Sequence, residues 1–251
     1  MDARDLEISR DDIEYAEDVP VSRDAAKIYP KEISFNGMVA FPHNQVRNGK
    51  PLGTCYADST TALIEYWVWR KCGRKIRFTD EEIFDCALDS KGIYGYEYRR
   101  DHTLAQLFSV GGNPAGVLTS AYKFNRMLGW HYFTDHQPSD NFALFASLAD
   151  ESFRDSTSFK VKQLSEYPFT NEDAAYSNAV KILFDYGPFI YVSYTNTAKT
   201  STHAWFAVGA GEDGLHLVNS YGSIEPVVDR WENVVKYFYN ASANCLPMLF
   251  I

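Results

Sequence analysis

Three residues that together can perform acyl-transfer chemistry occur in order along the chain: a thiol, an imidazole and a side-chain amide. Cys55 stands in Leu-Gly-Thr-Cys-Tyr-Ala, His203 in Thr-His-Ala-Trp-Phe-Ala-Val-Gly, and Asn219 in Val-Asn-Ser-Tyr-Gly. A thiol attacks a carbonyl carbon once an imidazole takes its proton, and an amide can hold that imidazole in the useful orientation. Because His203 lies 148 residues and Asn219 164 residues after Cys55, the fold must bring them together.

The apolar pattern after Cys55 predicts a helix over residues 56–71, with Gly73 as its stop. Apolar residues recur there near the helical period, and glycine readily takes the left-handed conformation that ends a helix. Cys55 therefore stands at a helix start, where the helix dipole and unpaired backbone N–H groups favour a thiolate. We expect a thiol of lowered pKa that forms an ion pair with His203.

The other predicted elements place helices first and short strands afterwards. Thr79, followed by three acidic residues, predicts the start of a second helix, and residues 35–54 have the composition of a loop. Helices are also predicted at 117–128, 140–153 and 171–186, and strands at 188–194, 204–210, 215–220 and 247–251, with a hairpin at 211–214. Helices followed by an antiparallel sheet indicate an α+β fold with two lobes.

Four fragments, in this order, resemble the papain-like cysteine peptidases of the C1 type. They are Cys55 with the aromatic and small residues after it, the run from Thr79 to Cys86, the Gly111-Gly112-Asn113-Pro114 segment, and the run from His203 through Asn219-Ser-Tyr-Gly. The resemblance implies a two-lobe fold in which a helical lobe carries the nucleophile helix and an antiparallel β lobe carries the histidine and the asparagine. It also implies hydrolysis of peptide bonds through a thioester.

The same resemblance implies a role for each site residue. Cys55 is the nucleophile, His203 the general base and acid, and Asn219 the residue that orients the imidazole. The backbone of Gly111 and Gly112 is expected to bind extended substrate. The resemblance implies a peptide or protein substrate, no cofactor and no metal.

Three positions depart from the family pattern. The oxyanion glutamine of the family precedes the cysteine by fewer residues than the ten between Gln45 and Cys55, so we predict a short loop insertion, with Gln45 as the donor and Asn48 as the lesser candidate. Tyr221 replaces the family's tryptophan and is expected to shield the histidine–asparagine hydrogen bond and contact substrate. Leu52 replaces a cysteine that is disulfide-bonded in secreted members.

The composition limits the partners of the chain. A formal net charge of −9 over 251 residues argues against general affinity for nucleic acid or anionic membranes. No apolar run approaches the roughly 20 residues that span a bilayer. The four scattered cysteines form neither a disulfide scaffold nor a CxxC zinc site, and the three besides Cys55 (Cys72, Cys86, Cys245) are interpreted as buried free thiols.

The localisation and the oligomeric state stay open at this point. No signal peptide is recognisable at the start of the chain. Few cysteines favour a reducing compartment or a signal-less export route.

Residues 1–34 are predicted to form an acidic arm, and residues 35–251 the papain-like catalytic domain. The first 18 residues hold eight acidic residues and two arginines, but Leu6, Ile13 and Val19 are among several spaced apolar anchors. The arm is shorter than the family's usual inhibitory pro-segment. Two hypotheses follow: the arm packs on the body and partly covers the cleft, or it binds elsewhere and only adds stability.

Two other classes of function remain open. The same three residues support other acyl transfers, such as those of a deamidase, a transglutaminase-like enzyme or an isopeptidase. The chain could also be an inactive binding module that keeps the cleft, although an intact thiol, imidazole and amide argue against it. The remaining histidines show no partner pattern and are interpreted as surface or hydrogen-bonded residues.

Overall fold

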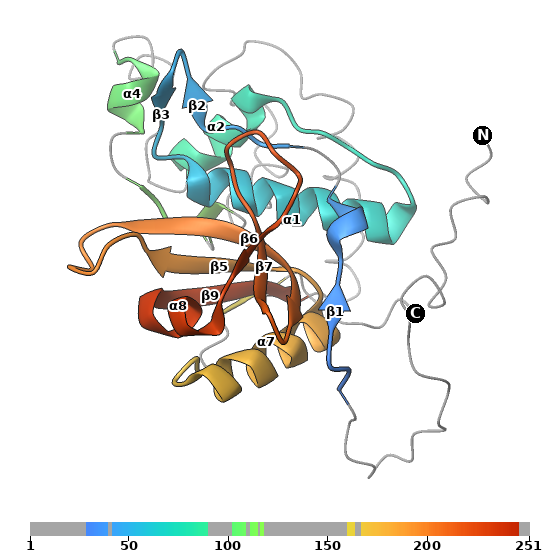
Figure 1. Ribbon diagram of the computed structural model, residues 1–251. Helices are drawn as coiled ribbons and strands as arrows, with labels where there is room; N and C mark the ends of the chain where they lie inside the picture. The colour runs from blue at the N-terminus through green and yellow to red at the C-terminus, as the bar shows by residue number, and fades with distance from the viewer. Residues whose placement is uncertain are drawn as a thin grey trace.

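The chain folds into two lobes of an α+β architecture, and the predicted fold class is confirmed. The computed structural model describes residues 29–39, 42–89, 102–108, 111–114, 116–117, 160–163 and 167–245. One lobe contains the helices α1 (Cys55–Cys72), α2 (Asp80–Asp89) and α4 (Leu104–Leu107). The other is built on an antiparallel sheet with the helices α7 (Glu172–Tyr186) and α8 (Trp231–Tyr237), as Figure 1 shows.

Helix α1 is the central element and is buried almost along its whole length, from Tyr56 to Trp69. It ends as predicted at Gly73, whose φ of 65° is the left-handed cap and whose N–H donates to the Trp69 carbonyl oxygen at 2.8 Å. The buried hydroxyls of Thr60 and Thr61 donate to carbonyl oxygens four residues earlier, at 2.7 and 2.8 Å. These bonds remove the cost of burying two polar side chains inside the helix.

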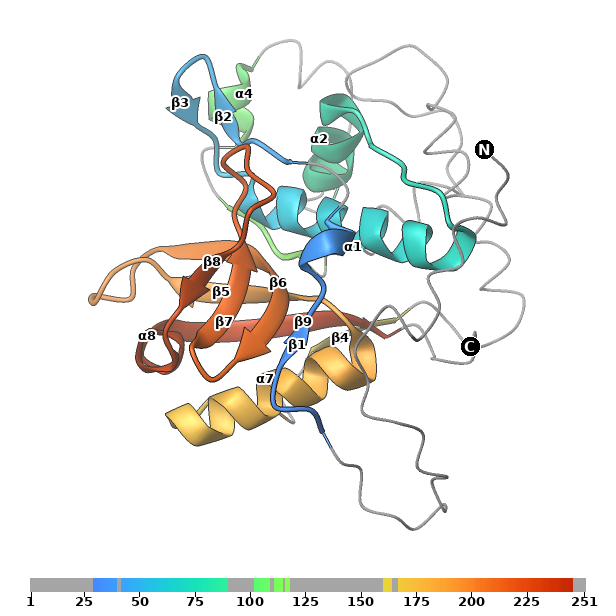
Figure 2. The ribbon, with the colours of Figure 1, turned by 45° about the vertical axis from the view of Figure 1, so that its right-hand side comes forward.

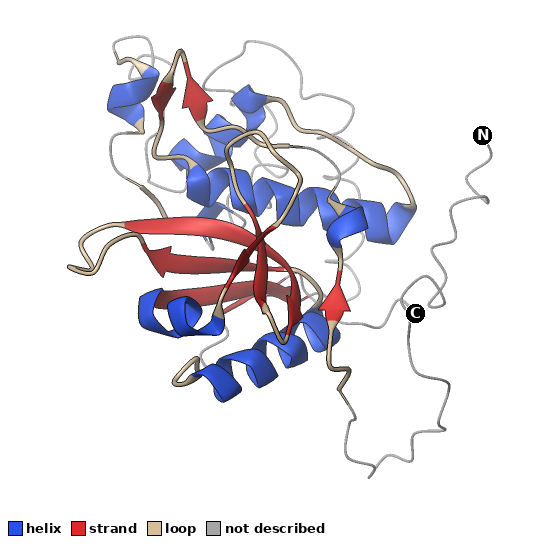
Figure 3. Cartoon of the chain, viewed as in Figure 1, coloured by secondary structure: helices blue, strands red, loops and turns tan. Residues whose placement is uncertain are grey.

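The sheet is antiparallel, and its main strand order is β4-β9-β5-β6-β7-β8. The strands are β4 (Lys160–Gln163), β5 (Phe189–Tyr194), β6 (Thr202–Gly211), β7 (Gly214–Val218), β8 (Val227–Asp229) and β9 (Phe238–Cys245). β6 and β7 form the predicted hairpin, with Gly211 paired to Gly214. Helix α1 lies on one side of this sheet, and α7 and α8 lie on the other (Figure 2). Figure 3 shows the same layers by element type.

Helix α7 covers the sheet from the side opposite α1. Its N-cap is Asn171, whose Oδ1 accepts from the Ala174 N–H at 2.9 Å, and Glu172 and Asp173 complement the helix dipole in the first turn. Ile182 and Leu183 are fully buried on its inner face. The helix predicted at 171–186 is therefore confirmed, as are the strands predicted at 188–194, 204–210 and 215–220.

The end of the predicted arm belongs to the body of the protein. Strand β1 (Ile33–Ser34) pairs with β6 through Ile33 and Ala210, and Ile33 is buried. Tyr29 packs edge-on against Phe184 of α7. The end of the predicted arm thus contacts the sheet and α7 through Tyr29, Lys31, Ile33 and Ser34, and the domain boundary at residue 34 stays a prediction. Residues 1–28 lie outside the described residues.

Several sequence predictions fall outside the described part of the chain. The helix predicted at 140–153 and the strand at 247–251 lie there entirely, and the helix at 117–128 does so except for its first residue. In the described part, no helix is both long and apolar enough to cross a membrane.

Candidate active site

Cys55 is the first residue of α1 and lies against strand β6. The backbone N–H groups of Ala204 and Tyr56 lie near enough to its sulfur to lower the thiol pKa, and Ala204 directly follows His203 in β6. Thr54 before it is completely buried. The predicted position of the thiol at a helix start is confirmed, and packing of α1 on β6 brings it beside the predicted histidine.

His203 and Asn219 are joined by a hydrogen bond of 2.8 Å between the imidazole Nε2 and the amide Oδ1. Asn219 follows the last residue of β7, and His203 is the second residue of β6, so the β6–β7 hairpin brings the two together. An amide oxygen only accepts hydrogen bonds, so Nε2 carries the hydrogen. The other ring nitrogen, Nδ1, is then the one left to accept a proton.

Two aromatic side chains contact the His203 ring. Tyr221 lies nearly parallel to it, with ring centroids 5.9 Å apart and an interplanar angle of 21°. Trp205 meets it at 86°, with centroids 4.7 Å apart. Tyr221 is 50% exposed, whereas His203 is 9% exposed, so the tyrosine forms an outer cover over the imidazole.

Burial shifts the pKa values of Cys55 and His203 in opposite directions. Burial raises the pKa of the Cys55 thiol, although the N–H groups of Ala204 and Tyr56 oppose this; the Asp58 carboxylate reinforces it. Burial lowers the pKa of His203 more than its bond to Asn219 raises it. Both directions favour a neutral thiol beside a neutral imidazole. The sequence prediction of a lowered thiol pKa is therefore corrected.

Gln45 is held against the residues that follow Asn219. Its backbone N–H donates to the Ser220 carbonyl oxygen at 2.8 Å, and its side-chain Oε1 accepts from the Ser220 hydroxyl at 2.8 Å. Its Nε2 donates to the Tyr221 hydroxyl at 3.1 Å. A further backbone bond runs from the Gly222 N–H to the His43 carbonyl oxygen at 2.8 Å. Because Oε1 is fixed by Ser220, the amide N–H₂ group has a defined direction.

A short hairpin explains the long spacing between Gln45 and Cys55. Strands β2 (Val46–Arg47) and β3 (Lys50–Pro51) are antiparallel and are joined by Asn48 and Gly49, with φ of 51° and 74°. Positive φ at both central residues is typical of the tight Asn-Gly turn. At the base of the hairpin, the Leu52 N–H donates to the Gln45 carbonyl oxygen at 2.9 Å. The hairpin therefore begins and ends at the same place, and its extra residues do not move Gln45 away from the start of α1.

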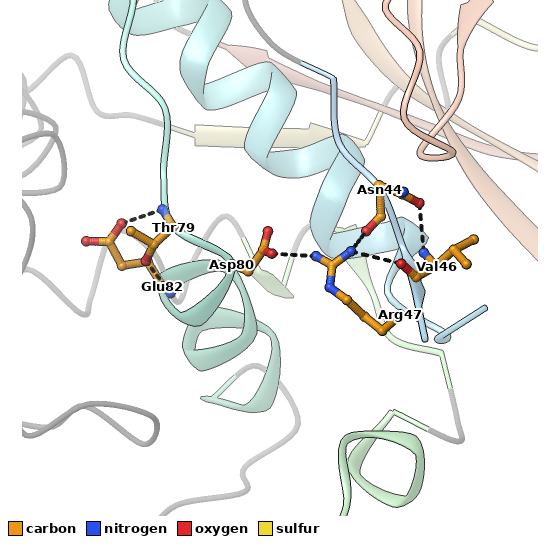
Figure 4. A network of polar contacts seen from close by, with 6 residues as sticks. All are labelled: Asn44, Val46, Arg47, Thr79, Asp80 and Glu82. Carbon is orange, nitrogen blue, oxygen red and sulfur yellow. Dashed lines mark hydrogen bonds and ion pairs between the residues drawn. The ribbon is translucent and has the colours of Figure 1, made fainter. Parts of the chain in front are cut away.

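The β2–β3 hairpin also contacts the start of α2, as Figure 4 shows. Arg47 forms an ion pair with Asp80 at 2.8 Å and donates to the carbonyl oxygens of Asn44 and Val46. α2 itself starts with a reciprocal cap, in which the Thr79 N–H donates to the Glu82 carboxylate at 2.9 Å and the Glu82 N–H donates to the Thr79 hydroxyl at 3.2 Å. Asn48 is exposed in the turn joining the two strands, and Gln45 stays the predicted oxyanion donor.

Figures 1 and 2 show the loop between β7 and β8 rising from the sheet to this hairpin. Asn44 and Tyr221 form a β-bridge where the two segments meet. The candidate site thus lies where the chain before α1 contacts the chain after β7.

The glycine pair lies alongside the start of α1. The Gly53 N–H donates to the Phe108 carbonyl oxygen at 3.2 Å, and a Cβ added to Gly53 would lie 3.6 Å from the Gly111 backbone nitrogen. Gly112 packs directly on the Tyr56 ring, because an added Cβ would come within 2.4 Å of it. The binding of substrate by Gly111 and Gly112 stays a prediction, but both glycines flank the residues around Cys55.

The sequence analysis did not single out a buried charged cluster beneath α1. Glu65 Oε2 lies 2.8 Å from His43 Nε2, and both side chains are buried. Burial lowers the pKa of His43, but the Glu65 carboxylate, together with that of Asp58, offsets this and leaves the pKa raised. Burial raises the pKa of Asp58, three residues after Cys55, to about 6. In the sequence, only its position three residues after Cys55 could have indicated that Asp58 affects the site.

Within the described residues, no group of three or more His, Cys, Asp or Glu side chains could hold a metal ion. Cys55 and Cys86 are free thiols. The candidate site combines a thiol, an imidazole that carries its hydrogen on Nε2, and side-chain amides.

No family model and no curated protein matches the sequence. Among solved structures, the chain is similar to the ragweed pollen allergen Amb a 11, a cysteine protease, in its proform. The two are 12% identical, with 88% of this chain and 68% of that chain covered and a TM-score of 0.47. It is also similar to a cysteine protease of Carica candamarcensis, at 18% identity, with 86% and 98% covered and a TM-score of 0.47.

Proposed function

We propose that the chain is a cysteine peptidase that hydrolyses peptide bonds through a thioester on Cys55. The observation that carries the proposal is the hydrogen bond from His203 Nε2 to Asn219 Oδ1, because it leaves Nδ1 as the proton acceptor. The contact of the Cys55 sulfur with the Ala204 N–H supports it, since it holds the thiol beside the residue that follows His203.

In the first step, the thiol proton moves to His203 Nδ1 while the sulfur attacks the carbonyl carbon of the substrate. General-base catalysis suits a neutral pair, because the raised thiol pKa and lowered imidazole pKa disfavour a standing ion pair. The carbonyl oxygen becomes an oxyanion. Its donors are the Cys55 backbone N–H and the Gln45 side-chain amide, which Ser220 holds in place.

In the second step, the imidazolium gives its proton to the leaving amine, and the carbon–nitrogen bond breaks. The acyl group remains on the Cys55 sulfur as a thioester. A water molecule then loses a proton to His203 and attacks the thioester carbonyl, which releases the acid and restores the thiol. Asn219 keeps the ring oriented throughout both steps.

The proposed substrate is an extended segment of a peptide or protein lying along Gly111 and Gly112. These glycines present backbone rather than side chains beside the residues around Cys55, which suits contact with a peptide main chain. No cofactor takes part in this mechanism. The proposed catalytic unit extends from residue 29 onwards, because strand β1 completes the sheet.

A mixed peptide library tests the proposal when its products are identified by mass spectrometry. New peptide termini are expected with the wild-type protein and with Cys86→Ser, but not with Cys55→Ser. The two variants are matched, since each exchanges one free thiol sulfur for oxygen, and only Cys55 lies at the site. Release of ammonia or cross-linked products without new termini would instead identify another acyl transfer.

A further inference from the structure

Trp205 is tied to the strand opposite His203 by a side-chain hydrogen bond. Its indole Nε1–H donates to the Ser193 hydroxyl oxygen at 3.0 Å. Ser193 is the direct cross-strand partner of His203 in the β5–β6 pair. Residues two apart on a strand and residues directly opposite each other share one face of a sheet, so these three side chains form one cluster.

This cluster restrains the His203 imidazole, because the indole that contacts the ring is itself held in place. The indole meets the His203 ring at 86°, the edge-to-face arrangement that aromatic rings prefer. Ser193 is 7% exposed, and its hydrogen bond prevents the indole from turning away. Asn219 restrains the Nε2 edge of the same ring. The ring is therefore held at two places, one polar and one aromatic.

We propose that Trp205, locked by Ser193, is a positioning residue for His203, which sets the orientation of the imidazole and keeps water from it. The inference rests on the proposed function, because it takes His203 as the base. It goes further because the family resemblance gives the orienting role to Asn219, whereas here Trp205 of β6 and Ser193 of β5 share that role.

Trp231, the first residue of α8, is a matched control. Trp231 donates its Nε1–H to the Gly211 carbonyl oxygen at 2.9 Å and meets the Tyr176 ring at 62°, with centroids 5.7 Å apart. It is thus a hydrogen-bonded indole in an edge-to-face pair, but at the end of β6 remote from His203. A purely structural tryptophan should behave like Trp231.

The test compares Trp205→Leu, Trp205→Phe, Ser193→Ala and Trp231→Phe in the full chain. Three readouts are measured: the titration of the His203 imidazole by NMR, the rate of Cys55 alkylation by iodoacetamide, and kcat and KM on a cleaved peptide. The first two need no substrate, so they judge the positioning role even if the chain cleaves no peptide.

For Trp205→Leu we expect kcat to fall about tenfold with KM nearly unchanged, because the ring loses its orientation while substrate contacts remain. Water should reach the imidazole, so the His203 pKa should rise towards its ordinary 6.5. Trp205→Phe and Ser193→Ala remove the same hydrogen bond. Each should lower kcat about threefold, and the double variant should be no worse than either alone.

Trp231→Phe should leave kcat and the His203 titration unchanged, even if it lowers the melting temperature. The inference is overturned if Trp205→Phe, Ser193→Ala and Trp231→Phe all keep wild-type kcat and His203 pKa. A wild-type chain that cleaves no peptide, combined with a His203 pKa that still moves in Trp205→Leu, would refute the proposed function and leave the positioning role standing.

Discussion

Gln45 and Ser220 bind each other through both main chain and side chain. The Gln45 N–H donates to the Ser220 carbonyl oxygen, and the Ser220 hydroxyl donates to Gln45 Oε1, each at 2.8 Å. The side chains are both buried. This pair couples the segment before the candidate nucleophile to the segment after Asn219, so the proposed oxyanion donor and the proposed orienting residue are positioned together.

Gln45→Ala should lower kcat about a hundredfold, because an oxyanion donor acts mainly in the transition state. Ser220→Ala should lower it less, since the amide remains but can turn. Steady-state kinetics on a cleaved peptide measure both effects. Asn48→Gly is the control, because glycine keeps the positive φ of that turn and only the exposed side chain is lost. Equal losses for Gln45→Ala and Asn48→Gly would contradict the assignment.

The rate of Cys55 alkylation should keep increasing with pH until the pH exceeds 9.0, the ordinary thiol pKa. The reason is that burial raises the thiol pKa and lowers that of His203, so little thiolate exists near neutral pH. The rate of peptide hydrolysis, in contrast, should be constant between pH 6.5 and pH 9.0, and should fall only below and above that range. Iodoacetamide rates measured across the pH range test this. Fast alkylation that persists into the acid range would indicate a standing ion pair instead.

Asp58→Asn should stabilise the protein by up to about 3 kcal/mol at neutral pH. The folded pKa of about 6 lies above the ordinary 3.8, so folding disfavours the charged carboxylate, and this penalty grows as the pH rises from 3.8 to about 6. The variant should therefore gain little stability below pH 3.8. Urea unfolding at several pH values measures the difference.

The same variant should also speed the alkylation of Cys55, because the Asp58 charge raises the thiol pKa. Asp173→Asn is the matched control, an exposed acid in the first turn of α7. If Asp58→Asn destabilises the protein at neutral pH, or leaves the alkylation rate unchanged, the electrostatic account of this residue is wrong.

Glu65→Gln should cost about 3 kcal/mol of stability near pH 6, because it leaves a buried, protonated His43 without its counter-charge. The His43 pKa is raised above 6.5, so the stabilisation by the pair is fully present below 6.5 and is lost as the pH rises through the folded value. The difference from wild type should shrink in alkaline solution. Asp80→Asn breaks the more exposed Arg47 pair and should cost below about 1 kcal/mol. A pH-independent loss for Glu65→Gln would contradict the assigned charge state.

Local signals in the sequence were sufficient to predict several elements, among them the helix that carries Cys55 and the strand that carries His203. Gly73 marked the end of α1, Asn171 the start of α7, and the Gly-Glu-Asp-Gly turn the β6–β7 hairpin. These residues act through backbone conformation or capping, which depends on a few neighbours only. The order of thiol, imidazole and amide then sufficed to predict the His203–Asn219 contact.

Four features were not predicted from the sequence, and most of them depend on residues that are distant along the chain. Strand β9 contains alanine, serine and asparagine, which have no strong strand preference, and it is stabilised by pairing with β4 and β5 on its two sides. The hairpin after Gln45 was predicted only as a loop, although Asn48-Gly49 is a hairpin signal. The His43–Glu65 pair joins residues 22 positions apart, which no helical or strand period connects. The thiol pKa was predicted in the wrong direction, because the helix start was visible in the sequence and the depth of burial was not.

The most direct test of the central claim is mass spectrometry of the intact chain after reaction with a peptide vinyl sulfone. The account predicts one added label, located on Cys55 and not on Cys86, with labelling lost in His203→Ala and slowed in Asn219→Ala. His216→Ala, which removes another buried histidine of the same sheet, should label like wild type. Absence of any label on the folded wild-type chain, or equal labelling of Cys55 in His203→Ala, would contradict the claim that Cys55 is a nucleophile activated by His203.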